Sequence, residues 1–441
     1  MLFPFLKYLQ PTHYFQLLTK QQNTVFPVVS ELPEAVLKQL TVDTGYVSAA
    51  AKDYDLSWQA VQKGYIGSVP TYTSFENLSI QDNYHFIRKY FHAAWVFYVL
   101  LLRLFAFKNA FKEIAAWLQT RNISRVSIGN QPMVYPDYDT YESALIQQNP
   151  KVSVVIPTLN RYTYLKEVLK DFEQQDYSNF EIIIVDQSEP FNEAFYADFK
   201  LDINLVRQEE KALWLARNTA IKHAKGAFIA LSEDDVRIPT HWISAHLKCL
   251  DFFNAQVSAG VFYPEGKQIP KERSFFALAS QFATGNAMLY KSVFEKVGLF
   301  DRQFEKQRMG DGEFGMRIYL EGIKSVSNPI ASCIDVKAGT GGLREMGSWD
   351  AFRPSNFFAP RPIPSVLYFF RKYFGNKAAR LALLRMVPLS IFPYQFKKNK
   401  PLLLIGVLLT ILIVPIVLYQ VCASWRLASK KLKEGDRIGR L

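Results

Sequence analysis

The sequence predicts an α/β fold: a Rossmann-like, mostly parallel sheet with flanking helices, together with a helical N-terminal region and C-terminal membrane-associated helices. Three observations predict it. From Lys151 onward, apolar β-branched runs alternate with segments of helical spacing, which is typical of a parallel sheet. Residues 1–148 contain no such alternation, and the longest uncharged run, 401–425, lies near the C-terminal end. We therefore expect three parts, over 1–148, 149–345 and 346–441.

The positive charge of the chain is concentrated near its C-terminal end. Residues 361–441 hold 15 of the 52 Lys and Arg but only two of the 40 acids, which leaves 37 bases against 38 acids elsewhere. The formal charge of +12 therefore does not indicate a nucleic-acid-binding domain, whose basic residues would gather on the folded domain itself. Basic residues beside an apolar run suit an anionic lipid surface. We expect membrane lipid, and no nucleic acid, as a partner.

The apolar run 401–425 is long enough to enter a membrane. As one helix it would extend roughly 37 Å, against a hydrocarbon core of roughly 30 Å. Basic residues flank both of its ends, so charge gives no orientation, and Pro415 in mid-run equally fits a re-entrant hairpin. Both arrangements stay open. The amphipathic segment 366–396 and a shorter apolar helix near 90–107 are expected at the membrane interface.

Cysteine usage favours a reducing compartment. The three cysteines are scattered and odd in number, so they indicate neither a disulfide framework nor a zinc site. The apolar start of the chain is short and lacks the pattern of a secretory signal. We expect a membrane-associated protein whose catalytic domain is cytoplasmic.

Three consecutive carboxylates follow one of the strand-like runs. Residues 227–232 are mostly apolar and lead directly into Glu233, Asp234 and Asp235. Carboxylates crowded at a strand end repel one another and resist burial unless a cation neutralises them. One interpretation is a hard metal ion that holds a phosphorylated ligand. The other is a solvated acidic turn before Pro239.

Polar residues also follow the two preceding strands. Residues 152–156 and 182–185 are continuous β-branched runs, which suit strands buried on both faces. The carboxyl ends of parallel strands meet at one edge of a sheet, so we expect a ligand crevice there, with a nucleotide as the leading ligand. Pro157 ends the first of these runs, and Asp186 ends the second.

Taken in order, these motifs resemble the family 2 glycosyltransferases, which have a GT-A fold. The resemblance covers about 151–344. Residues 152–161 are similar to the family's first strand and nucleotide loop, Ala216-Arg217-Asn218 to its Ala-Arg-Asn helix, and 231–235 to its acidic metal motif. The resemblance implies a nucleotide-sugar donor and a divalent metal, Mg²⁺ or Mn²⁺.

The same resemblance suggests roles for the donor-side residues. It implies that Pro157, Thr158, Asn160 and Arg161 bind the nucleotide-sugar. Asp186 matches the acid that reads the nucleotide base, and Arg217 would neutralise phosphate unless it pairs with a nearby acid. Asp235 is the leading metal ligand. Glu233 stands where the family usually has Asp, so its longer arm is expected to bind the metal directly or through water. Asp234 is expected to contact the ribose or to bind through water.

Two further departures from the family concern the metal and the base. Asp335 stands where many relatives place a metal-binding His; an oxygen ligand suits the same ions, although a solvated strand-end Asp is the alternative. Gly310 replaces the Glu of the family's Glu-Asp pair. Asp311 is therefore the leading general base and Glu313 the second candidate, while Asp311 also fits a helix cap.

The resemblance implies an enzyme of the hexosyltransferase type. It would transfer a single sugar with inversion from a nucleotide-sugar, a uridine diphosphate sugar in the first place, to a carbohydrate or lipid-linked acceptor at the cytoplasmic membrane face. The Gln-x-x-Arg-Trp motif of processive synthases is absent from the sequence. Two alternatives remain: a nucleotidyltransferase, which would release pyrophosphate, and a non-catalytic membrane-bound scaffold that binds a glycan or a partner enzyme.

Overall fold

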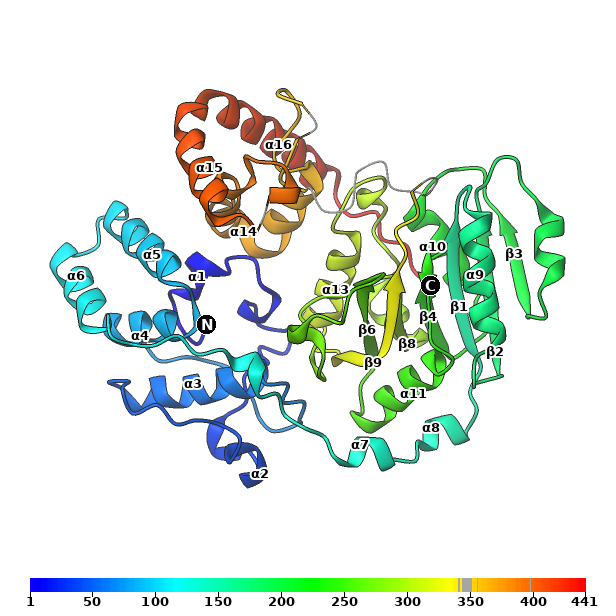
Figure 1. Ribbon diagram of the computed structural model, residues 1–441, viewed down its shortest axis with the longest axis horizontal. Helices are drawn as coiled ribbons and strands as arrows, with labels where there is room; N and C mark the ends of the chain where they lie inside the picture. Colours follow the sequence, from blue (N-terminus) through cyan, green and yellow to red (C-terminus); the bar gives the residue numbers. More distant parts are fainter. Residues whose placement is uncertain (340–341, 343–350, 355, 397) are drawn as a thin grey trace. The chain divides into compact units, whose positions relative to one another are not determined.

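The computed structural model describes residues 1–339, 342, 351–354, 356–396 and 398–441 (Figure 1). The chain divides into two compact units, each made of two stretches: Met1–Met133 with Phe370–Val414, and Val134–Phe369 with Pro415–Leu441. The boundary expected at 345 lies outside the described residues. The three-part division stays a prediction.

The first unit is helical, as predicted for the N-terminal region. Its N-terminal helices are α1 (Leu6–Leu9), α2 (Glu34–Leu37), α3 (Ala49–Gln62), α4 (Ile80–Tyr90), α5 (Ala93–Phe105) and α6 (Ala110–Gln119). Side chains at the N-caps of α3, α4 and α6 accept backbone N–H groups, which explains where these helices begin. Aromatic rings form the core between them, with Phe3 stacked on Phe86 at 3.8 Å.

The second unit contains the sheet, and its α/β character is confirmed. Its first half is parallel, in the order β3 (Ile203–Arg207), β2 (Phe180–Asp186), β1 (Val152–Thr158) and β4 (Phe228–Ser232). The path continues through β8 (Asn286–Tyr290), β6 (Val257–Pro264), β9 (Ser325–Asp335) and β5 (Val236–Arg237), and β7 (Ala277–Leu278) pairs with β9.

The second half of the sheet is mixed, whereas the first half is entirely parallel. β8 runs antiparallel to both β4 and β6, β6 and β9 pair in parallel, and β5 and β7 run antiparallel to β9. The signal read from the sequence was a continuous β-branched run. Such runs occur in β1 and β2, whereas β6 and β8 also contain Gly, Ser, Asn and Met, so their direction was not encoded in that pattern.

Helices cover both faces of the sheet (Figure 1). On one face α9 (Tyr162–Glu173) meets α11 (Trp242–Phe252) through the rings of Phe172 and Trp242. On the other face α10 (Leu213–His223) lies near α12 (Lys291–Val297) and α13 (Gly310–Leu320), joined by contacts through Phe300. Two four-residue helices, α7 (Asp137–Thr140) and α8 (Ala144–Gln147), precede β1.

The strand order creates a switch point between β1 and β4. From β1 the chain moves to β2 and β3 on one side and then returns to β4 on the other. Ligands of open α/β sheets bind at the carboxyl ends of the strands where the order reverses in this way. The residues that follow β1 and β4 are therefore the ones to inspect for a site.

The C-terminal helices are α14 (Pro364–Met386), which kinks at Gly375, α15 (Lys400–Leu412) and α16 (Val414–Glu434). Within the described residues no single helix is long and apolar enough to cross a membrane, while α15 and α16 satisfy those criteria together as a pair bent by 88°. The straight helix considered over 401–425 is therefore not found, because the chain breaks between α15 and α16.

Beyond α16 the chain runs along the second unit. The backbone N–H of Arg437 donates to Asp301 Oδ1 at 2.9 Å, and Leu299 N donates to Gly439 O at 2.9 Å. The Tyr368 hydroxyl donates to Asp436 Oδ1 at 3.0 Å. These bonds attach the C-terminal segment to the loop between α12 and α13 and to the start of α14.

Candidate active site

Arg161 and two carboxylates form the centre of the site, at the switch point between β1 and β4. The Nη1 of Arg161 donates to Asp234 Oδ1 and to Asp235 Oδ2, each at 3.0 Å. Thr158 at the end of β1 donates its hydroxyl to the other oxygen of Asp234, at 2.8 Å. The structure thus brings together residues that the sequence placed on separate strand ends.

A tight turn after β1 places Arg161. Asn160 has a φ of +55°, a left-handed conformation that Asn tolerates better than most residues. Its backbone N–H donates to Ser188 Oγ at 2.7 Å, and its side chain accepts from Glu189 N at 2.8 Å. The turn is therefore tied to the loop after β2, and Arg161 follows it as the N-cap of α9.

Burial and neighbouring charges raise the pKa values of both aspartates. Burial raises the pKa of Asp234 to about 6, and the charge of Arg161 opposes that rise. The pKa of Asp235 is also raised, first by burial and then by the charge of Glu233, with a contribution from Asp335. A further cation at this place would stabilise the ionised carboxylates.

Glu233 is held to one side of the site by a buried arginine. Arg217, which has no exposed surface, donates from Nη2 to Glu233 Oε1 at 3.2 Å and from Nη1 to the carbonyl of Thr284. A Cβ on Gly285 would come within 2.6 Å of Glu233 Cγ, so the longer acid needs a glycine beside it. The structure thus contains the ion pair that was the alternative for Arg217, and phosphate binding by this residue stays a prediction.

The segment after β9 wraps around Asp235. Val336 N donates to the carbonyl of Asp235 at 3.1 Å, and Ala338 N donates to its side chain at 3.3 Å. Asp335 ends β9 and accepts Lys337 N at 3.1 Å. The charge of Asp335 contributes to the raised pKa of Asp235, and its role as a metal ligand stays a prediction.

The carboxylates fit a hard divalent ion by their chemistry. Over the described part of the chain, no three His, Cys, Asp or Glu side chains are grouped as a ready cage. Mg²⁺ usually needs only one or two carboxylates, with water and substrate phosphate as its other ligands. Asp235, with Glu233 and Asp335 beside it, can supply these. Asp234 suits this role less well, since Thr158 and Arg161 engage both of its oxygens.

Asp186 lies at the end of β2 and is fully buried. Its Oδ2 accepts the hydroxyls of Tyr162 at 2.7 Å and Tyr196 at 2.8 Å, while Oδ1 accepts Ser188 N at 2.8 Å. Burial, reinforced by Asp186, raises the pKa of both tyrosines. The carboxylate therefore organises the loop after β2, and its contact with a nucleotide base stays a prediction. Sequence reasoning missed both tyrosines.

The two candidate bases on α13 differ in their surroundings. Asp311 is partly exposed in the first turn of the helix and accepts Gly312 N at 2.8 Å. Glu313 is fully buried and pairs with Arg317 at 3.0 Å, while Arg317 also donates to the carbonyl of Leu299 at 2.9 Å. Glu313 thus attaches α13 to the preceding loop, which favours Asp311 as the base.

The departure at Gly310 has a structural cause in Trp214 of α10. A Cβ on Gly310 would lie 2.3 Å from Cζ2 of the Trp214 ring, so a glutamate cannot stand there without a shift. The indole is buried and donates to the carbonyl of Phe304 at 3.0 Å, so Trp214 is a packing residue. Glu305, which sequence reasoning missed, accepts Trp214 N and Leu215 N at the start of α10.

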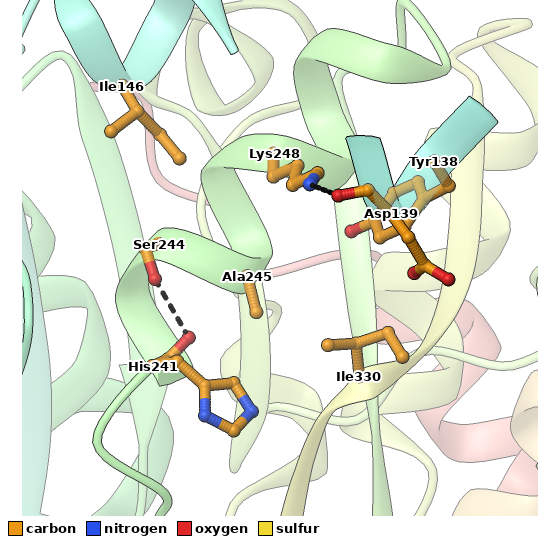
Figure 2. Close-up of a pocket in the computed structure, with 8 residues that line it drawn as sticks. All are labelled: Tyr138, Asp139, Ile146, His241, Ser244, Ala245, Lys248 and Ile330. Carbon is orange, nitrogen blue, oxygen red and sulfur yellow. Dashed lines mark hydrogen bonds between the residues drawn. The ribbon is translucent and has the colours of Figure 1, made fainter. Parts of the chain in front are cut away.

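A separate pocket of about 210 Å³ lies beside α11 (Figure 2). Lys248 donates to the carbonyl of Asp139 at 3.2 Å, and Ser244 donates to the carbonyl of His241 at 3.2 Å. None of its lining residues is a predicted site residue. They are Tyr138, Asp139, Ile146, His241, Ser244, Ala245, Lys248 and Ile330.

Comparison with known proteins agrees with the motifs. The family model described as "Glycosyl transferase family 2" matches residues 153–303. Glycosyltransferase GlyA of Streptococcus pneumoniae is 26% identical over 163 residues, which cover 36% of this chain and 22% of that protein. An uncharacterized glycosyltransferase of Rickettsia prowazekii is 30% identical over 177 residues, which cover 36% of this chain and 55% of that protein.

A solved structure, the mannosyltransferase PcManGT from Pyrobaculum calidifontis in complex with GDP-Man and Mn²⁺, shares 17% identity. The match covers 67% of this chain and 91% of that chain with a TM-score of 0.44, a likeness too low to support an argument about function. The chain spans no more than about half the length of the two curated relatives. The matched segment and the motifs within it identify a family 2 glycosyltransferase domain at residues 153–303 of this chain.

Proposed function

We propose that this glycosyltransferase moves a single hexose from a uridine diphosphate sugar to a carbohydrate or lipid-linked acceptor, with inversion and with a divalent metal. The observation that carries the proposal is the cluster of Arg161, Asp234 and Asp235 at the ends of β1 and β4. It combines acids for a metal with a cation for a diphosphate at the expected crevice of the sheet.

On the donor side, Asp235 would hold Mg²⁺ or Mn²⁺, with Glu233 and Asp335 as neighbouring ligands. A bound ion would offset the negative charge that develops on the departing diphosphate. Arg161 contributes a permanent positive charge beside the same acids. A guanidinium offers five N–H donors in a planar fork, a geometry that suits the oxygens of a phosphate.

On the acceptor side, Asp311 would take the proton of the attacking hydroxyl. It is partly exposed at the start of α13, whereas Glu313 is held by Arg317. The packing of Gly310 against Trp214 connects this turn to α10, the helix that also carries Arg217. A positioned carboxylate base of this kind supports a one-step transfer with inversion.

We place the acceptor at the cytoplasmic face of a membrane, with lipid as a partner. Support comes from the basic excess of residues 361–441 and from apolar side chains exposed on α15, namely Leu404, Leu408, Ile411 and Leu412. Apolar surface beside basic residues favours an anionic lipid interface. A lipid-linked acceptor would meet the enzyme there.

The test is to incubate the purified full chain with a panel of nucleotide sugars and candidate acceptors, with Mn²⁺ omitted and then restored. We expect metal-dependent release of nucleoside diphosphate with a uridine diphosphate sugar. Release of pyrophosphate would instead identify a nucleotidyltransferase. Metal-dependent donor binding without turnover on any acceptor would favour the non-catalytic scaffold.

A further inference from the structure

The hairpin of α5 and α6 exposes three phenylalanines at its tip. Phe105 is 76% exposed, Phe107 97% and Phe111 88%. Phe107 has a φ of +52°, an unusual conformation for an aromatic residue, in the turn between the helices. Isolated apolar side chains on a surface are common, but three large rings within seven residues form a patch.

The patch continues along both helices. Ile114 and Leu118 of α6 are exposed at helical spacing from Phe111, and Phe97 of α5 is half exposed. The apolar side of a surface helix is normally turned toward the core. In α5 and α6 part of the apolar side faces outward. The surface of this hairpin therefore differs from that of a hairpin whose apolar side is packed against a core.

The hairpin is firmly attached to α4, so loose packing does not explain the exposure. Glu113 of α6 is fully buried, pairs with Arg103 of α5 and accepts the Tyr84 hydroxyl of α4 at 3.0 Å. Arg88 of α4 donates to the carbonyl of Trp117 at 2.8 Å and to Thr120 Oγ1 at 3.1 Å. The phenylalanines therefore project from a fixed scaffold.

The charges around the tip are positive. Lys108 and Lys112 are both exposed and alternate with the phenylalanines in sequence. Glu113 is the single acid between residues 93 and 122, and it is buried. An apolar tip with exposed lysines and no exposed carboxylate on the same hairpin complements an anionic bilayer surface.

We propose that the tip formed by Phe105, Phe107 and Phe111 inserts into the interfacial layer of an anionic membrane, with Lys108 and Lys112 at the lipid phosphates. Phenylalanine is among the residues that interfacial helices bury at the boundary between headgroups and acyl chains. The inference rests on the membrane part of the proposed function and adds to it a specific insertion site on the first unit. It is independent of sugar transfer.

The test places a polarity-sensitive fluorophore on the tip of the full chain. Cys249 and Cys333 are buried and Cys422 is exposed, so Cys422→Ser with Phe107→Cys gives one accessible thiol. We expect a blue shift and a several-fold rise in emission with phosphatidylcholine–phosphatidylglycerol vesicles, and little change with phosphatidylcholine alone. The control is Val42→Cys, an exposed apolar position of the same unit, which should stay in water.

Two outcomes would overturn the proposal. One is a label at 107 that stays in water while the protein sediments with the anionic vesicles, which would assign binding to other segments. The other is a label already blue-shifted without vesicles, which would mean that a second copy or another part of the chain covers the tip.

A second set of variants separates this proposal from the enzymatic one. Phe105→Ser/Phe107→Ser/Phe111→Ser should lower the vesicle-bound fraction several-fold and leave nucleoside diphosphate release on a soluble acceptor unchanged. Val42→Ser/Val47→Ser should change neither. The two proposals can fail separately. If neither the wild type nor the variants turn over a nucleotide sugar but the label at 107 still enters the membrane, the proposed function is wrong and the insertion site is retained.

Discussion

The guanidinium of Arg161 lies 3.0 Å from the carboxylate of Asp235 and joins the end of β1 to the end of β4. Gly342, which has a φ of +91°, lies against the guanidinium of Arg161. A Cβ on Gly342 would come within 2.5 Å of Arg161 Nη2. Its N–H donates to the carbonyl of Leu159 at 3.0 Å. The guanidinium of Arg161 therefore already offsets part of the negative charge of Asp235.

Arg161→Gln should raise the affinity of the nucleotide-free protein for Mn²⁺ by about tenfold, since a positive charge is removed from a partly buried acidic pair. Calorimetric titration or Mn²⁺ paramagnetic resonance measures this. Arg237→Gln is the matched control, because Arg237 is two residues from Asp235 but bonds Asp171 at 2.6 and 2.7 Å. Equal changes in both variants would indicate a long-range charge effect only.

Asp311→Asn should lower the rate of sugar transfer by about 10²- to 10⁴-fold, the usual contribution of a general base. The amide has nearly the same shape as the carboxylate, so donor affinity and thermal stability should stay near those of the wild type. Turnover and donor binding are measured on the same preparation. Near-normal turnover would remove Asp311 from the base role.

Glu313→Gln should lower the unfolding free energy of the protein. The change leaves Arg317 without its buried ion-pair partner, and breaking such a pair costs about 3–5 kcal/mol of unfolding free energy. Denaturant unfolding measures the loss, and Glu313→Gln/Arg317→Met should recover part of it. Unchanged stability together with lost turnover would point instead to a catalytic Glu313.

Gly310→Ala should destabilise the second unit by about 1–3 kcal/mol, because its Cβ would overlap the Trp214 ring. It should also reduce transfer, since Asp311 is the next residue. Gly129→Ala is the control, as a Cβ there meets nothing within 4 Å. Both are compared by thermal unfolding, and equal midpoints would show that the indole moves aside at little cost.

Acidification should lower the stability of the protein, because His246 is protonated in the unfolded chain but not in the folded one. Burial lowers the pKa of His246 to about 3, against an ordinary value of 6.5, so the unfolded chain takes up a proton in that window while the folded protein does not. The unfolding free energy therefore decreases as the pH falls, by about 2 kcal/mol from pH 6.5 to 5 for this group.

The measurement is a denaturant series across that pH range, with His246→Gln expected to show a shallower dependence than the wild type. The imidazole contacts Ser258 Oγ at 2.8 Å and Asn286 Oδ1 at 3.1 Å, which glutamine can partly replace. His241→Gln removes an exposed imidazole and serves as the control. A slope in His246→Gln equal to that of the wild type would contradict this assignment.

Local patterns in the sequence were sufficient to predict the strand ends and the family resemblance. The β-branched runs of β1 and β2, and the polar residues that follow them, are encoded in neighbouring positions, because strands buried on both faces need continuous apolar runs. The acidic triplet and its place after Arg217 were likewise readable without coordinates. These features lie at the ends of β1 and β4, where Arg161 and Asp235 meet.

The tertiary structure decided which partner each charged group has. It paired Glu313 with Arg317, enclosed Asp186 between two tyrosine hydroxyls, and set Gly310 against Trp214. It also made the second half of the sheet mixed and broke the apolar run between α15 and α16. Several of these outcomes depend on contacts between residues far apart in the chain, such as Gly310 with Trp214 and Asp186 with Tyr162. Motifs and periodicity describe residues that are neighbours in the sequence. The sequence alone therefore determined the family resemblance and the strand ends. Packing in the folded protein determined which partners the side chains around those strand ends have.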